Sequence, residues 1–156
     1  MVFEASGAVK QPIILYDGYC NFCARIVRSI LRHDRKKRFR FSPLQSPFGA
    51  TIQGKLKAKY GAVPDSIVLV HNAKVFVRTD AVLRIAAIIG GPWYLLTPLW
   101  ILPRGVRNAL YNLFARKRYR WFGQRETCYL PQPKGGNRFL TEAGDLPQLK
   151  PAPQAP

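Results

Sequence analysis

Acidic residues are scarce in this 156-residue sequence. It contains 8 Asp and Glu residues against 25 Lys and Arg residues, which gives a formal net charge of +17. Such an excess directs attention to anionic partners, such as nucleic acid or phospholipid headgroups. Charge alone does not decide between these partners.

Cysteine is also rare, with three residues in a chain that is 47% hydrophobic. A chain that can bury a sizeable core does not need disulfide staples, and an odd number of cysteines argues against a disulfide framework. Two of the three cysteines lie in a C-x-x-C motif, which indicates a reducing compartment and a functional pair.

The sequence shows neither a secretory signal pattern nor an uninterrupted apolar run of membrane-spanning length. The stretch MVFEASGAVKQP at the N-terminus has no basic region followed by an apolar one, so we expect a cytoplasmic protein. Residues 85–103 carry no charge, but four helix-breaking residues divide them into two pieces (Gly90, Gly91, Pro92 and Pro98). This division favours buried or interfacial helices over a membrane span.

Short apolar runs that alternate with helical patterns predict an α/β fold with the element order β-α-β-α-β-β-α. Runs rich in β-branched and aromatic residues predict strands at residues 12–17, 38–46, 66–70 and 74–78. Apolar spacing predicts an amphipathic helix from Cys20 and a weaker helix at 48–60. A third helix, capped by Thr79 or Asp80, should end at Gly90.

This pattern divides the chain into four segments. We expect residues 1–11 to be a flexible N-terminus and residues 12–91 to form the α/β core. Residues 92–130 should be a helical C-terminal extension of the same domain. Residues 131–156 form a tail rich in Pro and Gly that is too polar to pack, and we expect it to be disordered.

Cys20 and Cys23, in the stretch LYDGYCNFCARIVRS, form the C-x-x-C motif at the start of the first predicted helix. This spacing places one sulfur at the exposed helix N-terminus and the other a turn deeper, close enough for a disulfide. The helix dipole and free N–H groups can lower a cysteine pKa from about 8.5 to roughly 3.5–7.5, which makes Cys20 the expected nucleophile. Cys23, on the apolar face, is the expected resolving thiol.

Asp17, three residues before Cys20, has two interpretations. As part of an Asp-Gly turn, its side chain can accept hydrogen bonds from backbone N–H groups. As a carboxylate beside the sulfurs, it opposes thiolate formation and can accept or relay a proton in the resolving step, so it is a candidate catalytic residue. Tyr19 adjoins the sulfurs and is a candidate substrate-binding residue that tunes access.

Two other interpretations of the cysteines remain open. A zinc site would need two more ligands, and the candidates are Cys128, His33 and His71. None of them has the Cys-x-x-Cys or His-x-x-x-His spacing of a second zinc-binding pair. The alternative that both cysteines are small core residues explains Cys23 better than Cys20, which lies at a polar junction. We therefore predict no metal and no cofactor other than a redox-active Cys20–Cys23 disulfide.

The basic residues have several interpretations as well. Eight of them lie between Arg25 and Arg40, where they could bind nucleic acid or anionic lipid, support a Cys20 thiolate, or form a solvated surface. Tryptophan and tyrosine residues at 93–121, together with Arg104, Arg107 and residues 115–120, could form an aromatic and cationic anchor at a membrane surface. The alternative is that the aromatic residues belong to the core and the basic residues form a solvated helix face.

The segment DGYCNFC, together with FRFSPLQS, VFVRTDAVLRI and RYRWFGQRETC, resembles the DCC family of predicted thiol-disulfide oxidoreductases over roughly residues 12–128. Asp17, Cys20 and Cys23 match its D-x-x-C-x-x-C pattern. The resemblance implies a thioredoxin-like core and thiol-disulfide exchange with a protein or small-molecule disulfide, supported by an unidentified electron donor. The alternative function is a basic nucleic-acid- or anionic-membrane-binding module, with a zinc protein third.

The resemblance also implies a substrate-binding position opposite the cysteines. In thioredoxin-like folds, a cis proline opens the third strand and faces the active-site sulfurs, and Pro64 stands at that position. The backbone of Val63 would then lie beside the sulfurs and could pair with an extended substrate segment. The chain lacks the Trp-Cys-Gly-Pro-Cys sequence of thioredoxin itself, so the substrate does not carry over.

Overall fold

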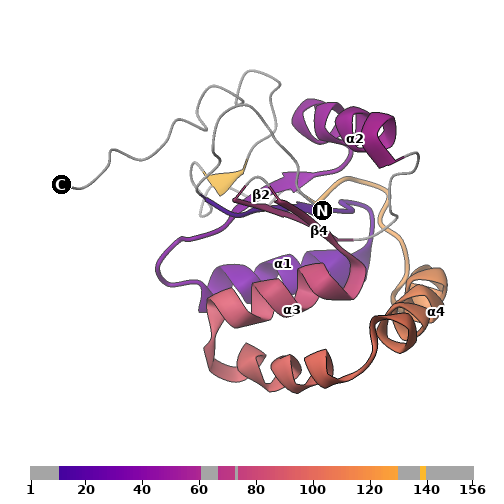
Figure 1. The fold of residues 1–156 in the computed structure, drawn as a ribbon. Coiled ribbons are helices and arrows are strands. Elements are labelled where there is room, and N and C mark those ends of the chain that lie inside the picture. Colours follow the sequence, from indigo (N-terminus) through magenta and orange to yellow (C-terminus); the bar gives the residue numbers. More distant parts are fainter. Residues whose placement is uncertain (1–10, 61–66, 73, 130–137, 140–156) are drawn as a thin grey trace.

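The computed structural model describes residues 11–60, 67–72, 74–129 and 138–139 (Figure 1). Their helices and strands follow the predicted β-α-β-α-β-β-α order with a helical extension, which confirms the predicted fold class. In chain order they are β1 (Ile13–Tyr16), α1 (Asn21–His33), β2 (Arg40–Pro43), α2 (Pro47–Tyr60), β3 (Val68–His71), β4 (Lys74–Val77), α3 (Arg78–Ile89), the 3-10 helix η1 (Gly91–Ile101) and α4 (Arg104–Phe122).

The four strands form one sheet in the order β2-β1-β3-β4, the arrangement of a thioredoxin-like fold. Strand β1 is parallel to β2, with Ile13 opposite Arg40, and antiparallel to β3, with Ile13 opposite Val70. Strands β3 and β4 form an antiparallel hairpin, and Asn72 has a φ of 50° after β3, as suits asparagine in a turn. Strand β1 is therefore hydrogen-bonded along both of its edges.

Helices cover both faces of this sheet. Figure 1 shows α1 and α3 on one face and α2 on the other. Alternate residues of β1 point to opposite faces. Ile14 and Tyr16 join the buried cluster with α1 and α3, whereas Ile13 and Leu15 join the cluster with α2. The C-x-x-C helix is therefore fixed to the sheet by its whole apolar side.

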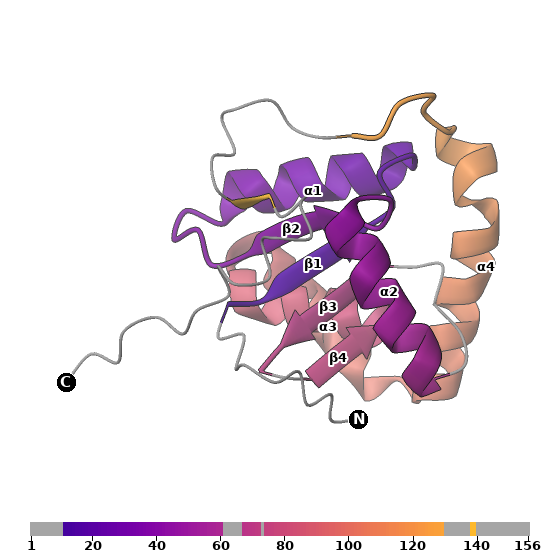
Figure 2. The same ribbon diagram turned by 90° about the horizontal axis from the view of Figure 1, so that it is seen from above.

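The extension η1–α4 packs against the α1–α3 side of the molecule. Figure 2 shows α4 along one edge, with its C-terminal end next to the start of α1. The side-chain amide of Asn21 donates a hydrogen bond to the Phe122 carbonyl oxygen at 2.9 Å, which ties these two helix ends together. The described part of the chain contains no helix that is both long and apolar enough to cross a membrane.

The start of α3 differs from the prediction. Neither Thr79 nor Asp80 caps this helix; Val77 occupies the cap position and makes no side-chain hydrogen bond there. The Thr79 hydroxyl instead hydrogen-bonds Asn108 at 2.8 Å, and Asp80 accepts from Arg107 at 3.1 Å. Both side chains thus contact α4, because tertiary contacts there replace the local capping bonds.

Two residues of the predicted disordered tail are packed. Arg138 forms an ion pair with buried Asp34, and the Phe139 ring stacks on Phe41 with 5.4 Å between centroids. The expectation that the tail is too polar to pack therefore does not hold at these two positions. The rest of residues 131–156 lies outside the described residues.

Candidate active site

The turn between β1 and α1 brings Cys20 to the N-terminus of the helix. Cys20 is the N-cap residue of α1, and its Sγ accepts a hydrogen bond from the backbone N–H of Cys23 at 3.4 Å. The Cys20 carbonyl oxygen accepts the first helical bond, from Ala24 at 3.0 Å. The sulfur therefore lies at the positive end of the helix dipole, where a thiolate is favoured.

Both cysteines are free thiols, and their electrostatic environments differ. A hydrogen bond from the Cys23 thiol, followed in importance by the Cys23 backbone N–H and the nearby Arg118 guanidinium, lowers the pKa of Cys20 to about 6, although burial opposes this shift. The same hydrogen bond, together with burial, raises the pKa of Cys23 well above its usual range. Near neutral pH, Cys20 is thus the thiolate and Cys23 the thiol.

Cys20 is not exposed at the helix end, contrary to the prediction. It is 0% exposed because residues 123–129, here called the covering segment, lie against the turn after β1. Gln124 forms a β-bridge with Cys20. The backbone N–H of Arg125 donates to the Tyr19 carbonyl oxygen at 2.7 Å, and that of Tyr129 donates to Gly18 at 2.8 Å.

Asp17 is buried between these elements and makes four hydrogen bonds through its side chain. Its Oδ1 accepts from the Tyr19 backbone N–H at 3.0 Å and from the Gln45 side chain at 2.9 Å. Its Oδ2 accepts from Arg118 at 3.3 Å and from the Tyr119 hydroxyl. The predicted turn role of Asp17 is therefore present, and its carboxylate also anchors α4.

Sequence reasoning missed Arg118 and Tyr119. Arg118 is only 3% exposed and forms a buried ion pair with Asp17. Burial of the Tyr119 hydroxyl, followed by its hydrogen bond to Asp17, raises the pKa of Tyr119 to about 12. Tyr119 therefore remains a hydrogen-bond donor at neutral pH. The basic run at 115–120 is interpreted from the sequence as part of a membrane-surface anchor or as a solvated helix face. The signal that could have separated Arg118 from its neighbours was the likeness to the family in the segment RYRWFGQRETC.

The third cysteine lies against the Asp17–Cys20 turn. A Cβ atom built on Gly18 would be 2.2 Å from Cys128 Sγ, so only glycine allows this approach. Burial and the Asp17 carboxylate raise the pKa of the half-buried Cys128, which is therefore a thiol rather than a thiolate near neutral pH.

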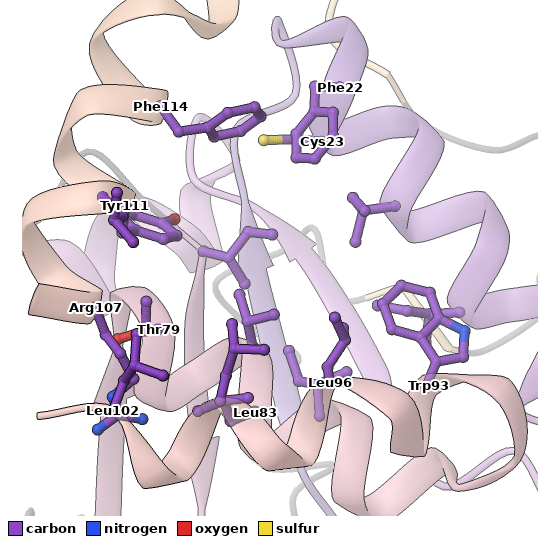
Figure 3. Close-up of a pocket in the computed structure, with 17 residues that line it drawn as sticks. Phe22, Cys23, Thr79, Leu83, Trp93, Leu96, Leu102, Arg107, Tyr111 and Phe114 are labelled. Atoms are coloured by element: carbon purple, nitrogen blue, oxygen red, sulfur yellow. The ribbon is translucent and has the colours of Figure 1, made fainter. Parts of the chain in front are cut away.

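An apolar cavity of about 480 Å³ adjoins the other cysteine. It lies between α1, α3, η1 and α4, and Figure 3 shows the Cys23 sulfur pointing toward the Phe114 ring at one end. The Phe22 ring packs against Phe114 with 4.8 Å between centroids. Cys23 lines this cavity and Cys20 does not, so the two sulfurs have different surroundings.

The structure describes only part of the predicted substrate site. Val63 and Pro64, and with them the predicted cis bond, lie outside the described residues. Tyr19 is half-buried. Its backbone N–H donates to Asp17 within the turn, and its carbonyl oxygen accepts from Arg125 of the covering segment. Within the described residues, no group of three or more His, Cys, Asp or Glu side chains could hold a metal ion.

Comparisons with known proteins agree on one family. The sequence pattern of the DCC1-like thiol-disulfide oxidoreductases matches residues 14–124. The uncharacterized protein YuxK of Bacillus subtilis is 31% identical over 139 residues, which cover 86% of this chain and 98% of YuxK. A chloroplastic DCC family protein of Arabidopsis thaliana is 39% identical over 125 residues, which cover 78% of this chain and 70% of the relative. No solved structure matches the chain significantly.

Proposed function

The chain belongs to the DCC1-like thiol-disulfide oxidoreductase family, and from this premise we propose that it exchanges a Cys20–Cys23 dithiol with the disulfide of a protein or small-molecule substrate. The observation that carries the proposal is the position of the Cys20 sulfur. It caps α1, accepts the Cys23 N–H at 3.4 Å, and has its pKa lowered to about 6, first by the Cys23 thiol.

The first step forms a mixed disulfide. The Cys20 thiolate attacks one sulfur of the substrate disulfide, a new bond joins Cys20 to that sulfur, and the substrate S–S bond breaks. The departing substrate sulfur leaves as a thiolate and takes a proton from water. Cys23 remains a thiol during this step because its pKa is raised by the hydrogen bond to Cys20 and by burial.

The second step releases the substrate. Once Cys20 is in the mixed disulfide, its negative charge is gone, and the hydrogen bond and repulsion that kept Cys23 protonated are lost. Cys23 then loses its proton and attacks the Cys20 sulfur, which forms the Cys20–Cys23 disulfide and frees the second substrate thiol. Overall, the enzyme dithiol gives up two electrons and the substrate disulfide becomes two thiols. A dithiol donor in a reducing cytoplasm would reverse this change.

Asp17 and Arg118 act on these sulfurs through their charges. The four hydrogen bonds to Asp17 occupy the acceptor sites of its carboxylate, so we assign it an electrostatic and positioning role rather than proton transfer. Its charge contributes to the raised pKa of Cys23, after the hydrogen bond to Cys20 and burial. Arg118, which Asp17 holds, lowers the pKa of both cysteines.

Substrate access requires movement, because Cys20 is 0% exposed. In this proposal the covering segment moves aside and a substrate disulfide approaches the Cys20 sulfur. The substrate backbone then pairs with Val63, beside Pro64, and contacts Tyr19, as expected from the family resemblance.

Insulin reduction driven by a dithiol tests the proposal. Cys20→Ser should lower the rate to that without enzyme, because the nucleophile is lost, whereas Cys23→Ser should accumulate a mixed disulfide visible by mass spectrometry. Cys128→Ser is the matched control and should retain the activity. Wild-type activity in Cys20→Ser would refute the proposal.

A further inference from the structure

Helix η1 exposes apolar side chains instead of burying them. None of its residues is buried, and Leu95 and Ile101 are 80% and 86% exposed, while Tyr94 and Trp100 are 62% and 47% exposed. Large apolar side chains that protrude this far from an ordered helix gain nothing from the protein's own core. Their exposure therefore calls for a partner.

The apolar surface continues onto α4. All exposed large hydrophobic residues of the described chain lie between Tyr94 and Trp121, on η1, on α4 or on the link between them. On α4, Leu110 and Leu113 are 58% and 52% exposed. Their restriction to one contiguous structural region distinguishes them from the single hydrophobic residues scattered over ordinary surfaces. We call this surface the η1–α4 face.

The segment that forms this face, residues 91–122, carries positive charges only. Residues 91–122 contain no Asp or Glu, whereas α4 exposes Arg104, Arg116, Lys117 and Arg120. The side chain of Arg104 is 81% exposed and pairs with Asp80 of α3 at 3.8 Å. The Lys117 ammonium lies 5.7 Å from the centre of the Trp121 ring. Cations on long stems beside exposed aromatic rings suit the headgroup region of an anionic bilayer.

The cavity beside Cys23 adjoins the same face. Leu99, Leu102 and Leu110 are each at least 38% exposed, and each also lines the cavity of about 480 Å³. In Figure 3, Leu102 and Leu96 lie at the η1 side of the cavity and Phe114 lies near Cys23. An apolar recess that opens among exposed leucines can hold acyl-chain carbon, which a nucleic acid does not offer.

We propose that the η1–α4 face docks on an anionic lipid bilayer. The apolar side chains of η1 enter the interface, the cations of α4 contact phosphate headgroups, and acyl carbon occupies the cavity. Docking does not require Cys20, because Cys20 is buried and does not line the cavity. A nucleic acid would bind the cations but leave the apolar side chains in water. A bilayer binds the cations and also buries the apolar side chains.

Vesicle sedimentation tests this proposal with the full chain. Phosphatidylcholine vesicles that contain phosphatidylglycerol should bind the protein, and binding should weaken with salt and without the anionic lipid. Leu95→Asp combined with Ile101→Asp should lower partitioning at least about tenfold, since two apolar side chains that would enter the bilayer are lost. Circular dichroism should show that this variant is folded, because both side chains are already exposed.

Two double variants that remove equal charge distinguish docking through the η1–α4 face from nonspecific electrostatic attraction to the vesicle. Arg116→Gln with Lys117→Gln removes two charges from α4, whereas Arg35→Gln with Lys36→Gln removes two from the loop after α1, on the opposite side of the molecule (Figures 1 and 2). The α4 pair should weaken vesicle binding several-fold more than the loop pair. Equal losses would overturn the proposed orientation.

Three further outcomes would overturn docking itself. These are no binding to anionic vesicles at low salt, binding to duplex DNA but not to vesicles, and a dimer in solution that Leu95→Asp with Ile101→Asp converts to a monomer without any vesicle binding. Cys20→Ser should bind vesicles like the wild type. Loss of insulin reduction in that variant therefore leaves the docking test intact.

Discussion

At the scale of single residues, the charge that supports the Cys20 thiolate comes from a distant part of the sequence. Arg118 lies on α4, 98 positions after Cys20, and is brought to the sulfurs by its ion pair with Asp17. This pair is almost fully buried, so each partner leaves an uncompensated charge when the other is removed. The site therefore depends on α4 as much as on the motif.

Replacing Arg118 tests this dependence. Arg118→Met should raise the pKa of Cys20 above about 6, because its positive charge contributes to lowering that pKa. The free energy of unfolding should fall by about 3 kcal/mol, because Asp17 loses its buried partner. The pH dependence of Cys20 alkylation gives the pKa, and urea unfolding gives the stability. Arg116→Met, on the exposed side of the same helix, should change neither; an unchanged alkylation profile in Arg118→Met would contradict the assigned role.

The wild-type thiol should titrate at an unusually low pH. With its pKa lowered to about 6, first by the hydrogen bond from the Cys23 thiol, Cys20 should react with iodoacetamide at a rate that rises through about pH 6 and then levels off. In the Cys23→Ser variant the midpoint should change, because the thiol donor is replaced. A rate that keeps rising up to about pH 8.5, the ordinary range of a cysteine, would count against thiolate stabilisation.

At the scale of elements, the covering segment lies over Cys20, which is buried. Its contacts with the turn after β1 are backbone hydrogen bonds to Gly18 and Tyr19 and the β-bridge to Cys20. Such bonds can be exchanged for bonds to a substrate backbone at modest cost. The close approach of Cys128 to Gly18 fixes the segment at one point.

A steric test can loosen this contact without touching the redox pair. Gly18→Ala places a Cβ 2.2 Å from Cys128 Sγ, so we expect a loss of about 1–3 kcal/mol in stability and faster alkylation of Cys20 as the segment shifts. Combining Gly18→Ala with Cys128→Ala removes the Sγ clash. This double variant should recover much of the lost stability, and the alkylation of Cys20 should slow toward the wild-type rate. A double variant as perturbed as the single one would show that the clash is not the cause.

At the scale of the whole molecule, the lowered pKa of Cys20 is also a contribution to folding. A group whose pKa falls from 9.0 in the unfolded chain to about 6 in the folded protein, chiefly through the Cys23 thiol, stabilises the fold above pH 9 and loses this effect as pH falls through 6. The raised pKa of Cys23, caused first by the same hydrogen bond, acts only above about pH 9. Between about pH 6 and pH 9, the raised pKa of Cys23 therefore does not offset the pH-dependent stabilisation that comes from Cys20.

Unfolding measurements on the reduced protein can detect this linkage. The free energy of unfolding of the wild type, minus that of Cys20→Ser, should rise between about pH 6 and pH 9. The subtraction removes the contributions of other titrating groups. A difference that stays flat across this range would mean that Cys20 titrates alike in the folded and unfolded states.

The sequence predicted local features well and long-range contacts poorly. The strands, the helix that begins at the cysteines and the Asp17 turn follow from short-range periodicity and turn chemistry, and they appear in the structure close to the expected boundaries. The cap of α3, the burial of Arg107 and the packing of Phe139 depend on partners far along the chain. Helical periodicity in a basic segment does not reveal which arginine meets a carboxylate.

The sequence by itself determined the element order, the family and the C-x-x-C pair at a helix start, because neighbouring residues set backbone propensity and the helix end favours a thiolate. Only the tertiary structure decided that α4 supplies Arg118 and Tyr119, that Cys20 is covered, and that the apolar residues of η1 face outward. Burial and charge pairing depend on which elements meet in space. That information is carried by the packing of the whole chain rather than by any one of its segments.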